Sequence, residues 1–297
     1  MEQLEEIRKK LRTRYIIFAI IIIATLCVGY GYLAMEVIFL VMLEVIIMVF
    51  ATHKLNAKYR GLFKSMFVEK SLNELFDNLI YQPEKGLPYD VIASTKMMNM
   101  GDRYHSEDYV SGEYKGIKFE QADVHIEEEH ETTDSDGHTQ TSYVTIFKGR
   151  WLVFDFNKNF KANAQISEKG FGNSKVKRFF GKKEDRFKRV KMESEEFNKK
   201  FKVYAQDEHE AFYLITPSLM ERIERLVNSN KGKFLFCFVD QRLHIGLYNH
   251  RSSFEPTSVF KKLDLQKIEE DVSKDIKVIT QFVDELNLDN NLFKVGV

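Results

Sequence analysis

Residues 125–130 hold the densest group of side chains that could bind a metal ion. His125, Glu127 and Glu129 alternate along the chain, and His130 follows them. Alternate residues of a β-strand share one face, so these imidazole and carboxylate groups could meet as ligands of a transition metal. A metal site also needs residues that support its ligands, whereas Thr, Ser, Asp and Gly follow this group. We therefore interpret the group as part of a solvated acidic hairpin, and we predict no metal site and no cofactor.

A basic segment at residues 175–191 could contact an anionic partner. It contains nine Lys and Arg residues against two acidic ones, with Phe residues between them. This pattern suits an anionic membrane surface or single-stranded nucleic acid, and a solvated loop is the interpretation without a ligand. We keep lipid contact and the solvated loop as alternatives and predict no nucleic-acid partner, because 44 acidic residues balance the 44 basic ones. The candidate lipid contacts are Lys182, Lys183, Arg186, Arg189, Phe179 and Phe180.

Glu44 is the acidic residue that interrupts an otherwise apolar run at residues 37–52. A carboxylate at the centre of a membrane costs about 3 kcal/mol and often marks an ion or proton path. The alternative is a protonated or hydrogen-bonded Glu44 that holds helices together, with Tyr30, Tyr32 or a second copy as its partner. We favour this structural role, because no second ionisable group lies near the middle of the predicted membrane segment.

Signatures of catalysis are absent from the sequence. It contains no phosphate-binding P-loop, nucleophile elbow, HExxH pair or CxxC motif. The run from His105 to Asp108 contains nucleophile and base types, but catalytic triads are assembled by the fold and not by adjacency in sequence. Cys27 and Cys237 both lie in apolar runs and suggest no disulfide. We therefore predict no catalytic residue, and we regard an enzyme as less favoured than a binding protein.

Two apolar runs lie near the N-terminus, and Glu44 belongs to the second of them. The 39 residues between Arg14 and Lys54 contain no Lys or Arg, and a helix needs about 20 apolar residues to cross a bilayer. We therefore predict two membrane spans, at about residues 15–34 and 36–53. A cleaved signal peptide is the alternative, but its apolar region would be only about 7–15 residues long.

The charges beside these runs predict how the chain crosses the membrane. Basic residues precede the first run and follow the second, and none separates the two runs. The positive-inside rule then places both termini in the cytoplasm. We expect a multi-pass protein of the inner (plasma) membrane with an external turn near Glu36.

The chain after residue 61 predicts an α+β fold. Apolar spacing indicates a helix at 62–79 and a short one at 89–97. Near-alternation of β-branched and aromatic residues indicates strands, with a turn at Lys148-Gly149. The expected strands are 114–120, 122–129, 141–148, 150–156, 164–167, 189–192, 201–205, 234–239 and 243–248.

Helix signals follow in the last third of the chain. Asp207 can cap one helix, and Thr216-Pro217 is a typical start of another. The fold class is thus a two-helix N-terminal transmembrane hairpin followed by a mixed, largely antiparallel α+β region with amphipathic helices. We predict three parts: the basic segment and hairpin (1–61), a helical linker with an antiparallel sheet (62–195), and a strand-helix-hairpin-helix subdomain (196–297).

Several short motifs give the chain a resemblance to a known family. They are Phe147-Lys148-Gly149 before an aromatic strand, residues 197–203, Asp207, and residues 216–220. With these motifs the chain resembles an uncharacterised bacterial membrane-protein family, catalogued as a domain of unknown function. The resemblance implies an N-terminal hairpin anchor and a cytoplasmic α+β domain, and it implies no activity or catalytic residues.

These features favour a membrane-anchored interaction or scaffold module. Its expected partners are the bilayer and either another protein or a second copy of the chain. The first alternative is an oligomeric channel or transporter subunit that uses the hairpin with Glu44. The second is a membrane-bound enzyme that acts on lipid or peptide.

Overall fold

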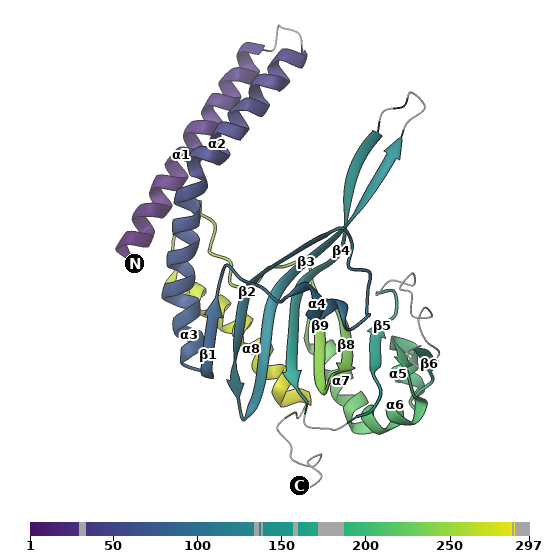
Figure 1. Ribbon diagram of the computed structural model, residues 1–297. Coiled ribbons are helices and arrows are strands. Elements are labelled where there is room, and N and C mark those ends of the chain that lie inside the picture. Colours follow the sequence, from purple (N-terminus) through teal and green to yellow (C-terminus); the bar gives the residue numbers. More distant parts are fainter. Residues whose placement is uncertain are drawn as a thin grey trace. The chain divides into compact units, whose positions relative to one another are not determined.

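The computed structural model describes residues 1–29, 34–133, 137, 139–156, 160–171, 187–286 and 288. Figure 1 shows its helices and strands. The chain divides into two compact units, and each is described by itself. The hairpin unit comprises Met1–Ser71 and Phe254–Ser273, and the sheet unit comprises Leu72–Ser253 and Lys274–Val297.

The hairpin unit is built from two long antiparallel helices, α1 (Glu2–Gly29) and α2 (Ala34–Phe63). A π-helical turn (Lys64–Glu69) and α3 (Lys70–Asn73) continue α2. The helices pack closely where α1 ends and α2 begins, since a Cβ on Gly29 would lie 2.4 Å from Val37 Cγ2. Both helices are long and apolar enough to cross a membrane, so the two predicted apolar N-terminal helices are confirmed.

The sheet unit contains one sheet of nine described strands, all paired antiparallel, in the order β1-β2-β3-β4-β9-β8-β5-β7-β6. This confirms the predicted α+β class. The strands are β1 (Asp77–Gln82), β2 (Arg103–Tyr114), β3 (Ile117–Thr133), β4 (Thr139–Asp155), β5 (Ala164–Glu168), β6 (Lys188–Val190), β7 (Phe201–Ala205), β8 (Lys233–Val239) and β9 (Arg242–Tyr248). The remaining helices are α4 (Tyr89–Ala93), α5 (Glu195–Lys200), α6 (Glu208–Leu214), α7 (Pro217–Ser229) and α8 (Leu265–Leu286).

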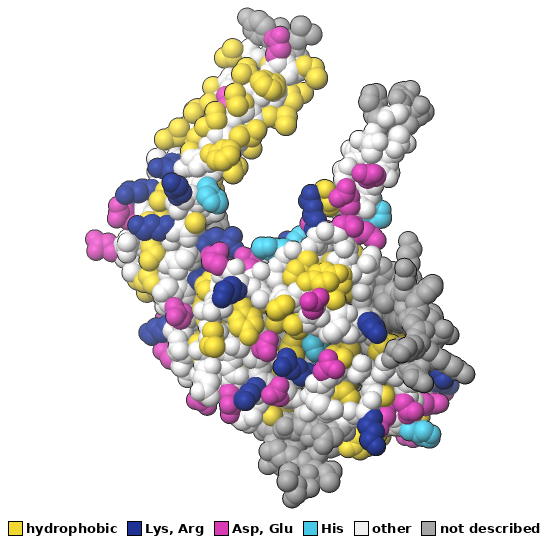
Figure 2. Space-filling view, in the orientation of Figure 1, with side chains coloured by type: hydrophobic (Ala, Val, Ile, Leu, Met, Phe, Trp, Pro, Cys, Tyr) yellow, Lys and Arg dark blue, Asp and Glu magenta, His cyan; other side chains and the backbone are white. Residues whose placement is uncertain are grey.

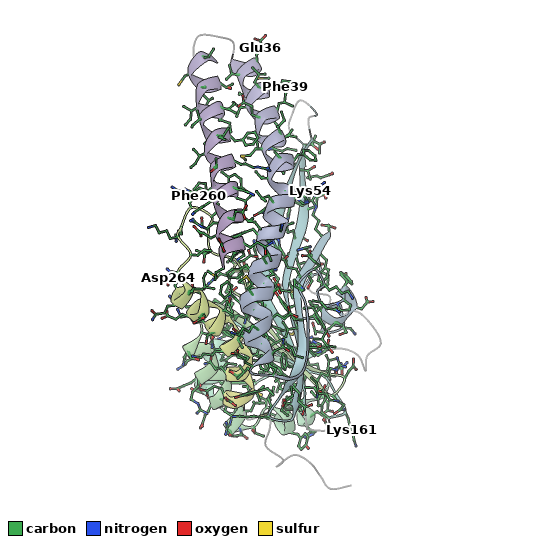
Figure 3. The ribbon with its side chains drawn as sticks, turned by 90° about the vertical axis from the view of Figure 1, so that its left-hand side faces the viewer. Glu36, Phe39, Lys54, Lys161, Phe260 and Asp264 are labelled. Atoms are coloured by element: carbon green, nitrogen blue, oxygen red, sulfur yellow. The ribbon has the colours of Figure 1, made fainter. Side chains whose placement is uncertain are left out.

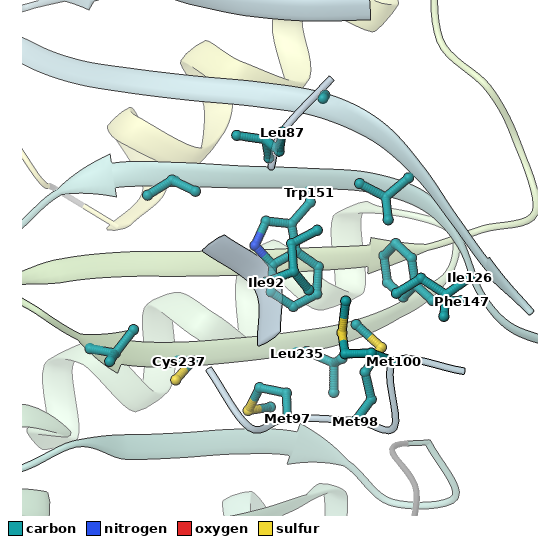
Figure 4. Packing of buried hydrophobic residues seen from close by; sticks show 14 residues of the cluster. Leu87, Ile92, Met97, Met98, Met100, Ile126, Phe147, Trp151, Leu235 and Cys237 are labelled. Carbon is teal, nitrogen blue, oxygen red and sulfur yellow. The ribbon is translucent and has the colours of Figure 1, made fainter. Parts of the chain in front are cut away.

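One face of the sheet is covered by α4 and the methionine-rich segment after it. Figure 4 shows Trp151 and Phe147 in this core, together with side chains from the segment. The two rings lie 5.6 Å apart between centroids, near edge to face. Gly246 on β9 leaves them room, because a Cβ there would lie 2.7 Å from the Trp151 ring. Aromatic burial of this kind supplies much of a domain's hydrophobic stabilisation.

The opposite face of the sheet is covered by α7 and by the second half of α8. Phe282 of α8 packs against Phe234 of β8, with ring centroids 6.0 Å apart. The α7 helix begins as predicted, because Thr216 Oγ1 accepts a hydrogen bond from the Leu219 amide at 3.3 Å and Pro217 occupies the first turn. Its apolar side chains, Leu219, Met220, Ile223, Leu226 and Val227, are buried. These helices bury the face that carries Arg150 and Asp123 as well as the apolar residues.

Two strands extend beyond the sheet as an arm, which Figure 1 shows clearly. β3 pairs with β2 only as far as Glu127, and β4 pairs with β9 only from Gly149 onward. Further out, β3 and β4 pair with each other alone. We call residues 128–133 and 139–147 the arm.

The predicted turn at Lys148-Gly149 is wrong, because β4 continues through both residues. Gly149 has an extended backbone with a φ of 158°. A Cβ at this position would lie 2.0 Å from the Leu247 carbonyl oxygen. The glycine therefore permits a close approach of β9, and it does not reverse the chain.

The predicted helix at 62–79 ends earlier, at Asn73, and β1 begins at Asp77. Residues 77–82 form an edge strand because β2 supplies their backbone partners, with Ile80 opposite Ser111. The spacing of apolar residues within a segment does not reveal whether another strand will pair with it. The predicted parts 62–195 and 196–297 both contribute strands to the same sheet.

Candidate functional site

The predicted metal-ligand group lies on β3, where it begins to leave the sheet. His125 Nε2 lies 3.6 Å from Glu127 Oε1. The Glu129 carboxylate instead accepts a hydrogen bond from the Tyr143 hydroxyl at 3.1 Å, and His130 Nε2 lies 3.4 Å from Glu128 Oε2. Within the described residues, no three ligand atoms of the group lie within 4.8 Å of one another. The strand thus brings together His125 and Glu127, and it does not assemble the whole set.

A small charged pocket lies next to His125, at the crossing of β2, β3 and β4. Its volume is about 110 Å³, and it is lined by His105, Glu107, Asp123, Val124, His125, Lys148, Gly149, Arg251 and Ser252. His105 is the direct cross-strand neighbour of His125, and Glu107 is that of Asp123. Burial lowers the pKa of His125, and the nearby Glu127 opposes this effect. Groups of both signs line the pocket, so its geometry favours no single ligand charge.

A buried polar network forms the floor of this pocket. The Asp123 carboxylate accepts hydrogen bonds from the Ser253 amide and from the Ser253 hydroxyl, the latter at 2.7 Å. Arg150 Nε donates to the same hydroxyl at 2.8 Å, and the guanidinium also donates to the backbone and side chain of Asp275 on α8. Burial raises the pKa of Asp123 to about 7, while Arg150 and Ser253 act in the opposite direction. Two distant parts of the chain, the segment that ends at Ser253 and helix α8, are thereby joined to β3 and β4.

Sequence reasoning missed this network. A partial signal was available, because Arg150 directly precedes the apolar and aromatic run at residues 151–154 of β4. A charged side chain at such a position must find partners when it is buried. The partners themselves, at positions 123, 253 and 275, have no recognisable spacing from it.

A larger groove of about 390 Å³ lies on the face of the sheet that carries α4. It crosses β2, β3, β4 and β9, and its rim includes Tyr109, Ser111 and Lys118. Arg242 lies 3.6 Å from Glu120 and 4.0 Å from Asp155 at its floor. Figure 2 shows acidic and basic side chains interspersed over this face. The groove is therefore polar and internally ion-paired.

The predicted lipid-contact residues are placed only in part. Arg189 lies on β6 and is exposed, opposite Tyr204 of β7. Lys182, Lys183, Arg186, Phe179 and Phe180 lie outside the described residues. Lipid contact by this segment stays a prediction.

Glu44 lies on α2 and faces α1. Its Oε1 accepts a hydrogen bond from the Thr25 hydroxyl at 2.5 Å. Its Oε2 is buried and has no hydrogen-bond partner among the described residues. Thr25 was not among the expected partners, although a hairpin that reverses after Gly29 places Thr25 opposite Glu44. Tyr30 and Tyr32 lie outside the described residues.

The described residues thus define an α+β protein with two apolar N-terminal helices. Residues 145–288, from β4 to the end of α8, match the model of a family described as "Protein of unknown function (DUF3137)". The expected resemblance to an uncharacterised domain-of-unknown-function family is confirmed.

Two further comparisons complete this result. No curated protein matches the chain. The crystal structure of the mycobacterial trehalose monomycolate transport factor A, TtfA, is similar over 77% of this chain and 94% of that chain, with 9% identity and a TM-score of 0.39. A likeness of this size assigns neither fold nor function to this chain.

Proposed function

We propose that this protein is a membrane-anchored interaction module. In this proposal α1 and α2 cross the bilayer, and the sheet unit binds a partner beside the membrane. The observation that carries it is the exposure of both helices: only 6% of the residues in an apolar 18-residue stretch of each helix are buried. Figure 2 shows the resulting apolar surface on the hairpin. Covering each Ile, Leu or Phe side chain with an apolar environment is worth roughly 1.5–3 kcal/mol, and a bilayer supplies that cover.

The orientation we propose has both termini in the cytoplasm. Arg8, Arg12 and Arg14 precede the first apolar run, and Lys54, Lys58 and Arg60 follow the second. Basic residues are retained on the cytoplasmic side of spans. This supports the inner (plasma) membrane as the location.

The arm is the surface that we propose for the partner. Among the described strands, none pairs with the outer edge of β4 between residues 139 and 147. An open edge offers backbone N–H and C=O groups to an added strand. Exposed edges are usually protected by Lys or Pro, and the sequence has neither between residues 128 and 147.

The charge of the arm defines the kind of partner. Glu128, Glu129 and Glu131 lie on β3, the strand that pairs with β4 in the arm, and no Lys or Arg occurs between residues 119 and 147. The base of the arm is ordered by Arg103, whose Cζ lies 3.4 Å from the centre of the Tyr143 ring. Carboxylates would repel a second arm and attract a cation. We infer that the arm binds an extended polypeptide segment rich in Lys and Arg.

The test uses the full chain in detergent and a fluorescent peptide of alternating Lys and Val. We expect binding that weakens with salt and that falls at least tenfold when Glu128, Glu129 and Glu131 are changed to Gln. The matched control changes Glu195, Glu196 and Glu208, which are exposed acidic residues at the starts of α5 and α6. Equal loss in both triple variants, or equal binding of a Glu-Val peptide, would overturn the arm as the binding surface.

A second candidate function is a channel or transporter subunit formed by several hairpins. The observation that favours it is the buried Glu44 Oε2, which lacks a partner among the described residues. A second copy or a transported cation could supply one. In proteoliposomes, Glu44→Gln should then abolish a proton flux, whereas Thr25→Val should alter it less. Absence of flux in the unmodified protein would exclude this candidate.

A further inference from the structure

A loop of the hairpin unit, residues 254–264, is fastened to the base of the two helices. Arg8 of α1 donates hydrogen bonds from Nη1 to the Val259 carbonyl at 2.9 Å and to the Lys261 carbonyl at 2.5 Å. Tyr59 of α2 donates to the Thr257 carbonyl at 3.0 Å. The loop is therefore held by side chains from both helices.

Arg8 is built into this contact and is not an ordinary surface residue. Its side chain is only 3% exposed. Its other donors reach the Glu5 carboxylate at 2.8 and 2.6 Å, which neutralises the buried charge. A guanidinium with four of its five N–H donors directed in this way fixes the backbone on either side of residue 260. Near the start of the loop, Glu255 forms an ion pair with Arg60 of α2, with 2.6 Å between Oε1 and Nη2.

Phe260 lies between the two carbonyls that Arg8 holds, and it points away from the protein core. The side chain is 56% exposed. Its ring centroid lies 6.1 Å from that of Tyr15, the first residue of the apolar run. Figure 3 shows Phe260 at the height of Lys54, which closes the second apolar run. The exposed ring therefore lies where the hairpin changes from charged to apolar.

The neighbouring side chains have the chemistry of a membrane interface. Lys261 and Lys262 follow Phe260 and are exposed. Phe side chains of segments on a membrane surface lie at the boundary between the headgroups and the acyl chains, and nearby Lys residues are attracted to anionic headgroups. Leu265, at the start of α8, is also exposed. The apolar side chains of Phe260 and Leu265 are therefore more favourably placed against a membrane than in water.

We propose that Phe260, Lys261 and Lys262 form a third membrane contact, in which the Phe260 ring enters the headgroup layer beside Tyr15. The ligand is a phospholipid surface that contains anionic headgroups. The contact rests on the proposed membrane insertion of α1 and α2. Its effect is to tie the start of α8 to the bilayer surface.

The test places a fluorescent reporter at the loop. Phe260→Trp in the full chain is reconstituted in vesicles of phosphatidylcholine and phosphatidylglycerol, some of them brominated near the headgroup end of the acyl chains. Trp151, the single native Trp, is fully buried and gives the same background in every sample. The matched control is Phe212→Trp, an exposed ring on α6 of the sheet unit.

We expect brominated lipid to quench the added emission of Phe260→Trp and to leave that of Phe212→Trp unchanged. Changing Lys261 and Lys262 to Gln in the Phe260→Trp chain should reduce the quenching in vesicles with phosphatidylglycerol and not in pure phosphatidylcholine. Flotation of the same vesicles separates the two proposals. Protein that floats without quenching at position 260 overturns the third contact alone, and protein that fails to float overturns membrane insertion and the contact together.

Discussion

At the scale of single residues, buried ionisable groups in the sheet unit determine how stability responds to pH. His244 is almost fully buried on β9, and its Nδ1 accepts a hydrogen bond from Trp151 Nε1 at 3.4 Å. Burial, helped by the positive Arg242, lowers the pKa of His244 to about 4. The imidazole is therefore neutral in the folded protein.

We predict that His244 makes the fold less stable in acid. Below its ordinary pKa of 6.5 the unfolded chain binds a proton that the folded chain does not bind. The contribution is therefore complete above pH 6.5 and is lost as the pH falls towards 4. This shift in the pKa of His244 corresponds to a loss of about 3 kcal/mol in the free energy of unfolding. His244→Gln keeps an acceptor for Trp151 and removes the titration, so its free energy of unfolding should fall less between pH 7 and pH 4.

The measurement is chemical unfolding of the full chain in detergent, followed by Trp151 fluorescence. Asp123 acts in the opposite sense, because its raised pKa favours the fold at low pH and loses this contribution as the pH rises through about 7. Both wild type and His244→Gln contain Asp123, so its contribution cancels when their free energies of unfolding are subtracted. Identical pH dependence of the two chains would contradict the neutral, buried assignment of His244.

At the scale of elements, Arg150 connects β4 to the segment before residue 254 and to α8. Its hydrogen bonds reach Ser253 and Asp275, and Ser253 in turn binds Asp123. Removing one partner of a buried charged pair leaves the other without compensation, at a cost of about 3–5 kcal/mol. We predict that Arg150→Met destabilises the sheet unit by that amount.

Denaturant unfolding of Arg150→Met and of the double variant with Asp123→Asn measures this cost. The double variant should recover part of the lost stability, since it removes the buried carboxylate whose charged form Arg150 favours. The control is Arg242→Met, whose half-exposed side chain makes only longer ion pairs and should lose less than about 1 kcal/mol. An Arg150→Met chain as stable as this control would show that the network does not hold the elements together.

At the scale of the whole molecule, the membrane anchor and the sheet unit carry separate parts of the proposed function. The hairpin unit would supply location, and the arm would supply recognition. The two proposals fail independently, because insertion is measured by flotation and arm binding is measured in detergent.

The orientation of the anchor gives a further prediction. Glu36 is exposed at the start of α2, beyond the first apolar helix. If both termini are cytoplasmic, Glu36→Cys in a Cys27→Ala background should react with a membrane-impermeant maleimide in intact cells. Lys58 is exposed on the other side of the second run, and Lys58→Cys in the same background should react only after lysis. The reverse pattern would invert the proposed topology.

The sequence by itself determined the features that depend on local physics. The two apolar helices follow from residues that favour lipid over water wherever they are placed. The starts of α6 and α7 follow from Asp207 and Thr216, whose side chains accept hydrogen bonds from amides three residues later. The β8–β9 hairpin was also predicted, because two strand patterns, 234–239 and 243–248, flank the short polar run at 240–242. In the structure, Asp240 and Gln241 adopt the positive φ values of a tight turn.

Only the tertiary structure decided the features that join distant residues. The extended strand at Gly149, the pairing of β1 with β2, and the contact of Arg8 with the loop at 259–261 each depend on a partner far away in sequence. The same is true of Thr25 with Glu44 and of Arg150 with Asp275. Composition and periodicity indicate how well a residue suits its own helix or strand. Which backbone or carboxylate comes to lie beside it is settled by how the whole sheet and hairpin pack.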